Sequence, residues 1–241
     1  MLLVRGDLAG AEAMDREALA MQRKLLGNEH PELAVTLHNL SSIRSQRGDL
    51  AGAEAMLREA LAMQRNTLGK ENLTVAGTLS DLASLLVSRG DMVGAEREAR
   101  EALAIRRKLR GTDDPGVSDT LLPLAAARAA RGDLNEAELL FSEIVAAKRK
   151  LLGDSHPDLA YMLFLSAGIA QRRGNEPRAE AQLLEAWRIL ETTSFPVDPK
   201  RRRDIVIVLG VFYEEWSRKD PTKAKAAAQW KERRREIERG Q

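Results

Sequence analysis

Apolar side chains recur at helical spacing along most of this sequence. Between Pro31 and Arg47, leucine or isoleucine stands at positions 33, 37, 40 and 43, the spacing of a helix that buries one face. Small and apolar residues continue at this spacing as far as Gly69. Pro31 suits a first helical turn, Gly48 a helix end, and Asp49 the N-cap of a second helix. The pattern predicts two helices joined by a tight turn, and no segment shows the sustained alternation of a strand.

This pair of helices is repeated with a period of 42 residues. Segments 6–27 and 48–69 differ at only three positions, so the repeat is a duplication of sequence as well as of shape. We interpret 1–241 as a single repeat array. Its predicted parts are a half repeat at 1–27 with a second helix only, repeats at 28–69, 70–111, 112–153 and 154–193, an irregular link at 194–199 and a C-terminal capping hairpin at 200–241. Two glycine ladders mark the period, at Gly6, Gly48, Gly90, Gly132 and Gly174 and at Gly27, Gly69, Gly111 and Gly153.

One such hairpin cannot bury its apolar face alone. Stacked neighbours bury it, which predicts an all-α solenoid. Aromatic residues are only 4% of the chain, so leucine, alanine, valine and methionine must build the core. Methionine recurs with the period, and we expect core packing for Met14, Met21, Met56 and Met63.

Pro123 interrupts the predicted first helix of the fourth unit. An interior proline removes a backbone hydrogen bond and clashes with the preceding turn. We therefore expect a kink at Pro123, or a helix that begins late, near Ser118 or Thr120.

The half repeat at 1–27 lacks the first helix of its pair. We expect either a fragment of a longer protein or an end that another subunit covers. In the second case the chain would self-associate through this half repeat, and an interface would include Leu2, Leu3 and Leu19.

The composition narrows the chemistry. The chain has no cysteine, and 38 basic and 36 acidic residues give a net charge of +2. Basic clusters at 200–203 and 231–235 are the only feature typical of nucleic-acid binding, and because glutamate interrupts the second, nucleic acid is not an expected partner. No apolar run approaches the length of a bilayer span, and the apolar stretch at the N-terminus is too short for the core of a signal peptide. We therefore predict a cytoplasmic protein that does not bind membranes.

Three histidines are the candidate metal ligands and catalytic bases. His30 and His156 lie three periods apart, and each precedes a proline, which indicates capping of a linker. His38 has no partner residues in a catalytic or metal-binding pattern. A nucleophile elbow and a glycine-rich phosphate loop are both missing from the sequence. We predict that the chain is no enzyme and carries neither metal nor cofactor.

The repeat resembles a known family. Residues 30–40, which begin His30-Pro31-Glu32-Leu33-Ala34, and the segment from Ala53 to Gly69 are similar to the two helices of kinesin-light-chain-like tetratricopeptide repeats. The resemblance implies a right-handed superhelical solenoid of antiparallel helix hairpins whose first helices line a concave face. The family usually has Asn-Asn before a leucine of the first helix. Here the pairs are His38-Asn39, Ser80-Asp81, Leu122-Pro123 and Phe164-Leu165, so only Asn39 keeps an amide that could bind a peptide backbone.

The resemblance implies a scaffold for protein–protein interaction that binds a peptide or partner segment in its concave groove. Phe164 and Tyr161 would be the anchors. The alternative is a regulatory or oligomerisation module of a larger signalling protein, such as a bacterial serine/threonine kinase or a transcription regulator, because the C-terminal stretch resembles the closing repeat of bacterial arrays. The residues expected to face the groove are Val35, His38, Asn39, Ser42, Ser45, Ser80, Ser84, Leu122, Ala126, Tyr161, Phe164, Gln171, Val208 and Phe212.

Overall fold

A computed structural model describes residues 8–28, 30–111 and 114–239, and this part of the chain contains helices and no strand. The chain forms two compact units, Met1–Asp133 and Leu134–Gln241. The first unit contains α1 (Leu8–Leu26), α2 (Pro31–Gln46), α3 (Leu50–Leu68), α4 (Leu73–Arg89), α5 (Met92–Arg110) and α6 (Pro115–Ala130). The second contains α7 (Leu134–Leu152), α8 (Pro157–Arg172), α9 (Glu176–Thr192), α10 (Pro199–Lys219), the short 3-10 helix η2 (Pro221–Lys223) and α11 (Ala224–Arg239).

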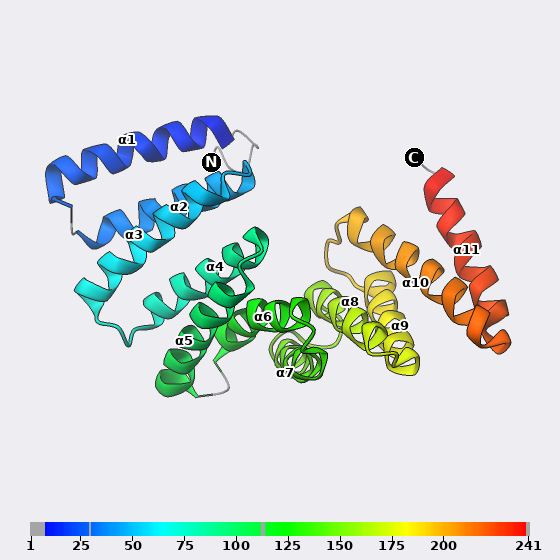
Figure 1. The fold of residues 1–241 in the computed structure, drawn as a ribbon. Coiled ribbons are helices and arrows are strands. Elements are labelled where there is room, and N and C mark those ends of the chain that lie inside the picture. The colour runs from blue at the N-terminus through cyan, green and yellow to red at the C-terminus, as the bar shows by residue number, and fades with distance from the viewer. Residues whose placement is uncertain (1–7, 29, 112–113, 240–241) are drawn as a thin grey trace. The chain divides into compact units, whose positions relative to one another are not determined.

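Consecutive helices pack as antiparallel hairpins, which confirms the predicted all-α class. In the first unit α2 packs on α3 and α4 on α5, and in the second α8 packs on α9 and α10 on α11 (Figure 1). Within each unit, every hairpin also contacts the next one, through α3 and α4 for example. The apolar faces between these helices are therefore covered by the partner helix and by a neighbouring hairpin.

The predicted caps hold the helix ends. Asp49 Oδ1 accepts a hydrogen bond from the Gly52 N–H at 2.9 Å at the start of α3. At the end of α4, Gly90 has a φ of 82°, a left-handed conformation that only glycine adopts without strain. The Nδ1 atoms of His30 and His156 accept the backbone N–H two residues later, at 3.3 and 3.1 Å, so the prediction of linker capping is confirmed.

Leucine and alanine build the core of the first unit. Leu33, Leu37 and Leu40 of α2 are at most 1% exposed and pack with Ala60 and Met63 of α3. Because alanine has only one side-chain carbon, the helix axes approach closely and the leucines fill the space between them.

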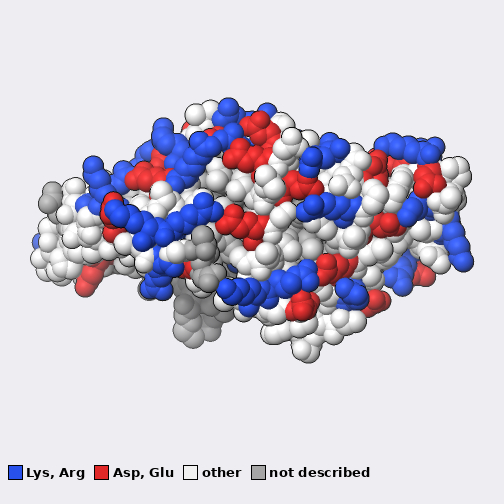
Figure 2. Space-filling model, turned by 90° about the horizontal axis from the view of Figure 1, so that it is seen from below, with Lys and Arg blue, Asp and Glu red and all other residues white. Residues whose placement is uncertain are grey.

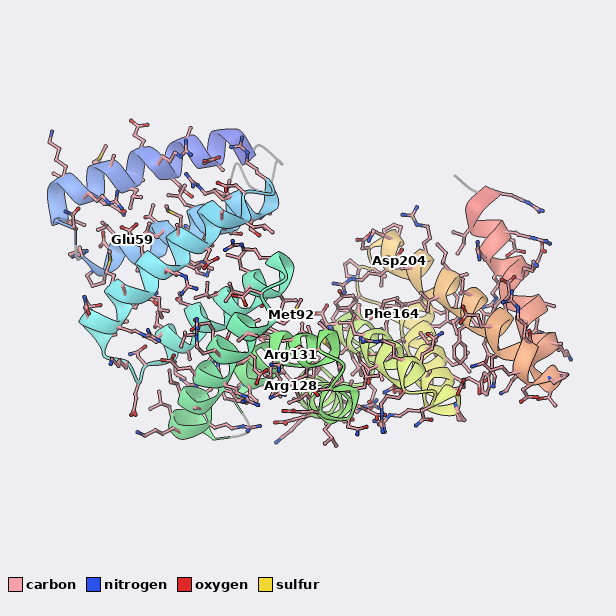
Figure 3. All side chains as sticks on the ribbon, viewed as in Figure 1. Glu59, Met92, Arg128, Arg131, Phe164 and Asp204 are labelled. Carbon is pink, nitrogen blue, oxygen red and sulfur yellow. The ribbon has the colours of Figure 1, made fainter. Side chains whose placement is uncertain are left out.

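Glutamates at equivalent positions of α1, α3, α5 and α7 each bind arginine at the end of the next helix in the chain, and all but Glu54 are buried. Glu96 on α5 accepts from Arg128 at 2.6 Å and from Arg131 at 2.8 Å, and both arginines lie at the C-terminal end of α6 (Figure 3). Its carboxylate side chain is 11% exposed. Equivalent pairs join Glu12 to Arg47, Glu54 to Arg89 and, in the second unit, Glu138 to Arg173. These ion pairs connect one hairpin to the next.

Pro123 does not delay its helix. The expected late start near Ser118 or Thr120 is wrong, because α6 begins at Pro115 and continues through Pro123. Asp114 explains the early start, since its Oδ1 accepts the Gly116 N–H at 3.3 Å and Pro115 suits the first turn.

Two of the periodic methionines are not in the core. Met63 is 6% exposed and packs against α2, but Met14 and Met21 on α1 are 61% and 56% exposed. The prediction of core packing is therefore wrong for Met14 and Met21. The physical reason is that no first helix covers this side of α1 in the described part of the chain.

Candidate functional site

The first unit has a cavity of about 270 Å³ between α2 and α4, which we call the serine pocket. Five serines line it, and among the described residues His38 and Asp81 are its only charged or titratable lining side chains. Leu57 and Leu85 supply its apolar surface. The other lining residues are Ser41, Ser42, Ser45, Gln46, Ser84 and Ser88.

His38 and Asp81 connect the two walls of the serine pocket. His38 Nε2 lies 2.8 Å from Asp81 Oδ2, and both side chains are partly exposed. The hydrogen bond to Asp81 raises the pKa of His38, while partial burial of the ring works in the opposite direction. The imidazolium is therefore favoured beside this carboxylate.

The hydroxyls on the α4 wall have their hydrogens committed to the backbone. Ser84 Oγ donates to the Ser80 carbonyl at 3.1 Å, and Ser88 Oγ donates to the Ser84 carbonyl at 3.2 Å. On the α2 wall, Gln46 Nε2 donates to Ser42 Oγ at 3.3 Å. The oxygens of Ser84, Ser88 and the Gln46 amide therefore keep lone pairs that can accept hydrogen bonds from a ligand.

The second unit has a smaller cavity of about 30 Å³, which we call the aromatic pocket. Its lining residues are Tyr161, Phe164, Leu190, Arg201, Asp204 and Ile205.

Two rings and a cation shape the aromatic pocket. The Tyr161 and Phe164 rings are stacked, with centroids 6.5 Å apart and an interplanar angle of 18°. The Arg201 guanidinium lies 5.2 Å from the Tyr161 centroid and also binds Asp158 at 2.9 Å. Phe164 on α8 and Asp204 on α10 mark two of the helices that line this site, and α9 contributes Leu190 (Figure 3). Because Tyr161 remains 40% exposed, an apolar ligand group can reach the rings.

The predicted groove residues divide between exposed and buried positions. His38, Ser42, Ser45 and Ser84 line the serine pocket, and Tyr161 and Phe164 line the aromatic pocket. Val35 and Asn39 are exposed on α2 outside the cavity. The partly exposed residues are Leu122, Ala126, Gln171 and Val208, of which Gln171 donates to Glu215 at 3.4 Å and Val208 packs against the core of the second unit.

The expected groove position is wrong for Ser80 and Phe212. Ser80 is buried between α4 and α6, where its Oγ donates to the Ala76 carbonyl at 2.9 Å and shares a 2.8 Å hydrogen bond with Thr120 Oγ1. Phe212 is 2% exposed and packs beside Tyr213 and Trp216.

Sequence reasoning also missed site residues. Asp81 is one residue after Ser80, and it shares a helix face with Ser84 and Ser88, three and seven residues later. From that spacing, Asp81 could have been assigned to the same surface as Ser84 and Ser88. No comparable sequence pattern points to Gln46, Arg201 or Asp204 as site residues.

Metal and membrane sites find no support in the described residues. No group of histidine, aspartate and glutamate side chains there could hold a metal ion. In the same residues, each helix is too short or too polar to cross a bilayer. Lysine and arginine alternate with aspartate and glutamate over the face in Figure 2.

Comparison with known proteins decides the family. The profile described as "Tetratricopeptide repeat" matches residues 1–66 and 74–150, more than half of the chain. The chain belongs to the tetratricopeptide repeat family. No curated protein matches the sequence.

Solved structures show the same fold. BtubC (BKLC) from P. vanneervenii superposes with a TM-score of 0.79 at 22% identity, over 97% of this chain and 93% of that one. A putative kinesin light chain with nearly identical TPR-like repeats from Podosopora anserina gives a TM-score of 0.66 at 25% identity, over 81% and 92%. YrrB, described as a TPR protein with an unusual peptide-binding site, gives 0.50 at 18% identity, over 79% and 82%. The kinesin-light-chain-like resemblance seen in the sequence is thereby confirmed.

Proposed function

We propose that this tetratricopeptide repeat protein binds a peptide segment of a protein partner on the surface of its first helices, with the aromatic pocket as the main anchor. Repeat arrays present extended surfaces that suit protein binding. One solved relative of the fold, YrrB, is described as having a peptide-binding site. The proposal includes no catalytic step.

The exposed ring of Tyr161 carries the proposal. Tyr161 is 40% exposed although it stacks on the partly buried Phe164, and an aromatic ring open to solvent is a favourable anchor for an apolar side chain. The cation of Arg201 over Tyr161 restricts the ring and lowers the entropy that ordering it on binding would cost. The small volume of the cavity indicates that the tip of one apolar side chain enters it.

Peptides selected against the whole chain from a random display library serve as the probe, because this selection does not require the partner to be identified. The dissociation constant of a selected peptide is then measured for the wild type, Tyr161→Ala, Phe164→Ala and the control Leu139→Ala. Leu139 is 72% exposed on α7 and lies outside the pocket. We expect each aromatic substitution to weaken binding about tenfold or more, the range of an anchoring residue, and the control to have no effect. Unchanged affinity in both aromatic variants would exclude this pocket as the anchor.

A second candidate function, self-association, has support from the first helix. Met14, Met21 and Leu25 form a stripe on α1 at helical spacing and are 61%, 56% and 73% exposed. The equivalent positions on α3 are Met56, Met63 and Thr67, and the two methionines pack against α2. Methionines that are exposed on α1 and covered at the equivalent positions of α3 fit an interface.

We propose that a second copy of α1 covers this stripe in the antiparallel direction. Glu17 and Lys24 lie along one edge of the stripe, seven residues apart. A two-fold antiparallel pair would place each of them beside its opposite charge on the other copy. Of the interface residues expected from the sequence, Leu2 and Leu3 lie outside the described residues. Leu19 is 7% exposed and packs in the core, so the prediction that it lies in an interface is wrong.

Light scattering after size exclusion tests this candidate. A dimer that Met21→Glu converts to a monomer, and that Leu139→Glu leaves intact, supports pairing through α1. A monomer at all concentrations excludes it.

A further inference from the structure

We propose that the serine pocket receives a lysine or arginine side chain of the partner, whose cationic group binds Asp81. The inference rests on the proposed function in one respect: it takes the first-helix surface as the place where the partner lies. It adds the chemical class of a partner residue at a second position.

The Asp81 carboxylate is the group of the pocket that would bind a cation. Asp81 supplies its only carboxylate, with a side chain 53% exposed, and none of the lining residues is lysine or arginine. Among the described residues, the one group bound to Asp81 is His38, through Oδ2, so Oδ1 is available. Among the lining residues, Asp81 on α4 is the one charged group that faces the imidazole of His38. The helix α3 contributes only Leu57 to the cavity.

The hydrogen-bonding groups of the α4 wall favour a donor. Ser84 and Ser88 give their hydrogens to the backbone, and on the α2 wall Gln46 Nε2 gives one of its two hydrogens to Ser42. The α4 wall therefore offers acceptor oxygens beside the carboxylate. Ammonium and guanidinium groups carry several N–H donors and no acceptor, so they match this arrangement.

The volume and the apolar lining of the serine pocket fit one long basic side chain. A volume of about 270 Å³ lies just below the range of cavities that hold drug-sized molecules. Leu57 and Leu85 provide apolar contacts for the methylene groups of lysine or arginine. A peptide lying along α2 and α4 could insert such a side chain while its backbone stays outside.

His38 competes with the incoming cation. In the free protein it occupies one oxygen of Asp81, so a basic side chain must share or displace that contact. Removing the imidazole should therefore strengthen binding, and removing the carboxylate should abolish the preference for a cation.

The test is an NMR titration of the whole ¹⁵N-labelled chain with N-acetyl-argininamide, which carries a single positive charge. N-acetyl-norleucinamide, of similar length and without charge, is the matched ligand. We expect saturable shifts at the backbone amides of Ser42, Asp81 and Ser84 with the arginine probe only. Asp81→Asn should weaken binding about fivefold or more, and His38→Ala should strengthen it.

Glu32→Gln is the control variant, because Glu32 is an exposed acid on α2 outside the pocket. It should bind the probe as the wild type does. Equal shifts with both probes, no saturable shift with arginine, or unchanged affinity in Asp81→Asn would each overturn the proposal. The titration uses no partner and does not involve Phe164, so failure of the aromatic anchor and failure of the cation site give different results.

Discussion

Arg131, at the end of α6, binds Glu96 of α5 at 2.8 Å. Equivalent arginine–glutamate pairs occur one period earlier and one period later in the chain. Arg128 binds the other oxygen of the Glu96 carboxylate at 2.6 Å. Glu96 is 8% exposed, so its charge depends on these arginines for the hydrogen bonds that water would otherwise provide.

Removing Arg128 should destabilise the first unit. Arg128→Ala removes one of three arginines that pair with the buried Glu96 carboxylate, since Arg100 and Arg131 remain, and we expect the free energy of unfolding to fall by about 2 kcal/mol. Urea unfolding followed by circular dichroism measures the change. Lys70→Ala, at an exposed position between α3 and α4, should change it by less than about 0.5 kcal/mol. Equal effects of the two substitutions would contradict a structural role for the pair.

Burial predicts a large difference between two neighbours on α2. Leu37 is 0% exposed and Val35 is 63% exposed. Leu37→Ala should cost about 3 kcal/mol through lost burial and the cavity it leaves, and Val35→Ala should cost less than about 0.5 kcal/mol. The same urea experiment compares them. Similar costs would mean that α2 is rotated about its axis relative to the described packing.

Two glycines associated with α4 should respond in opposite ways to alanine. Gly90 has a φ of 82°, so Gly90→Ala should destabilise the protein by about 1 kcal/mol. Gly77 lies inside the helix, and an added Cβ would meet only Arg106 at 3.9 Å, an ordinary contact. Gly77→Ala should stabilise by about 0.5–1 kcal/mol because alanine favours helix. Thermal unfolding of both variants checks the signs.

The His38–Asp81 pair predicts a pH dependence. Because the pKa of His38 is raised in the folded chain, the pair stabilises the fold fully below the unfolded value of about 6.5, and this contribution is lost as the pH rises through the folded pKa. An NMR titration of the imidazole should show a lower midpoint in Asp81→Asn than in the wild type. An unchanged midpoint would show that Asp81 does not control His38.

Much of the fold could be predicted from the sequence because each 42-residue period repeats the same capping residues and the same spacing of apolar residues. Asp49 and Gly90 cap and end their helices as expected, and the spacing of Leu33 and Leu37 indicates which face is buried. These features depend on residues close in the chain.

The site was less predictable because it depends on how each helix is rotated about its axis. Ser80 and Asp81 are neighbours, yet the first is buried against α6 and the second is exposed in the serine pocket. Packing against the next hairpin decides this difference, and the sequence of α4 alone does not contain it. Glu12 likewise lies four residues before Arg16, at the spacing of a local ion pair, although its buried carboxylate also binds Arg47, 35 residues away.

Photo-cross-linking of a bound peptide shows directly whether peptides lie on the first-helix surface. A photoreactive benzoylphenylalanine replaces Tyr161 in one variant and Leu139 in a second, and each is irradiated with the same display-selected peptide. We predict a cross-linked product from position 161 and none from position 139. A product from position 139 alone would show that peptides bind away from the first-helix surface, and would contradict the proposed function.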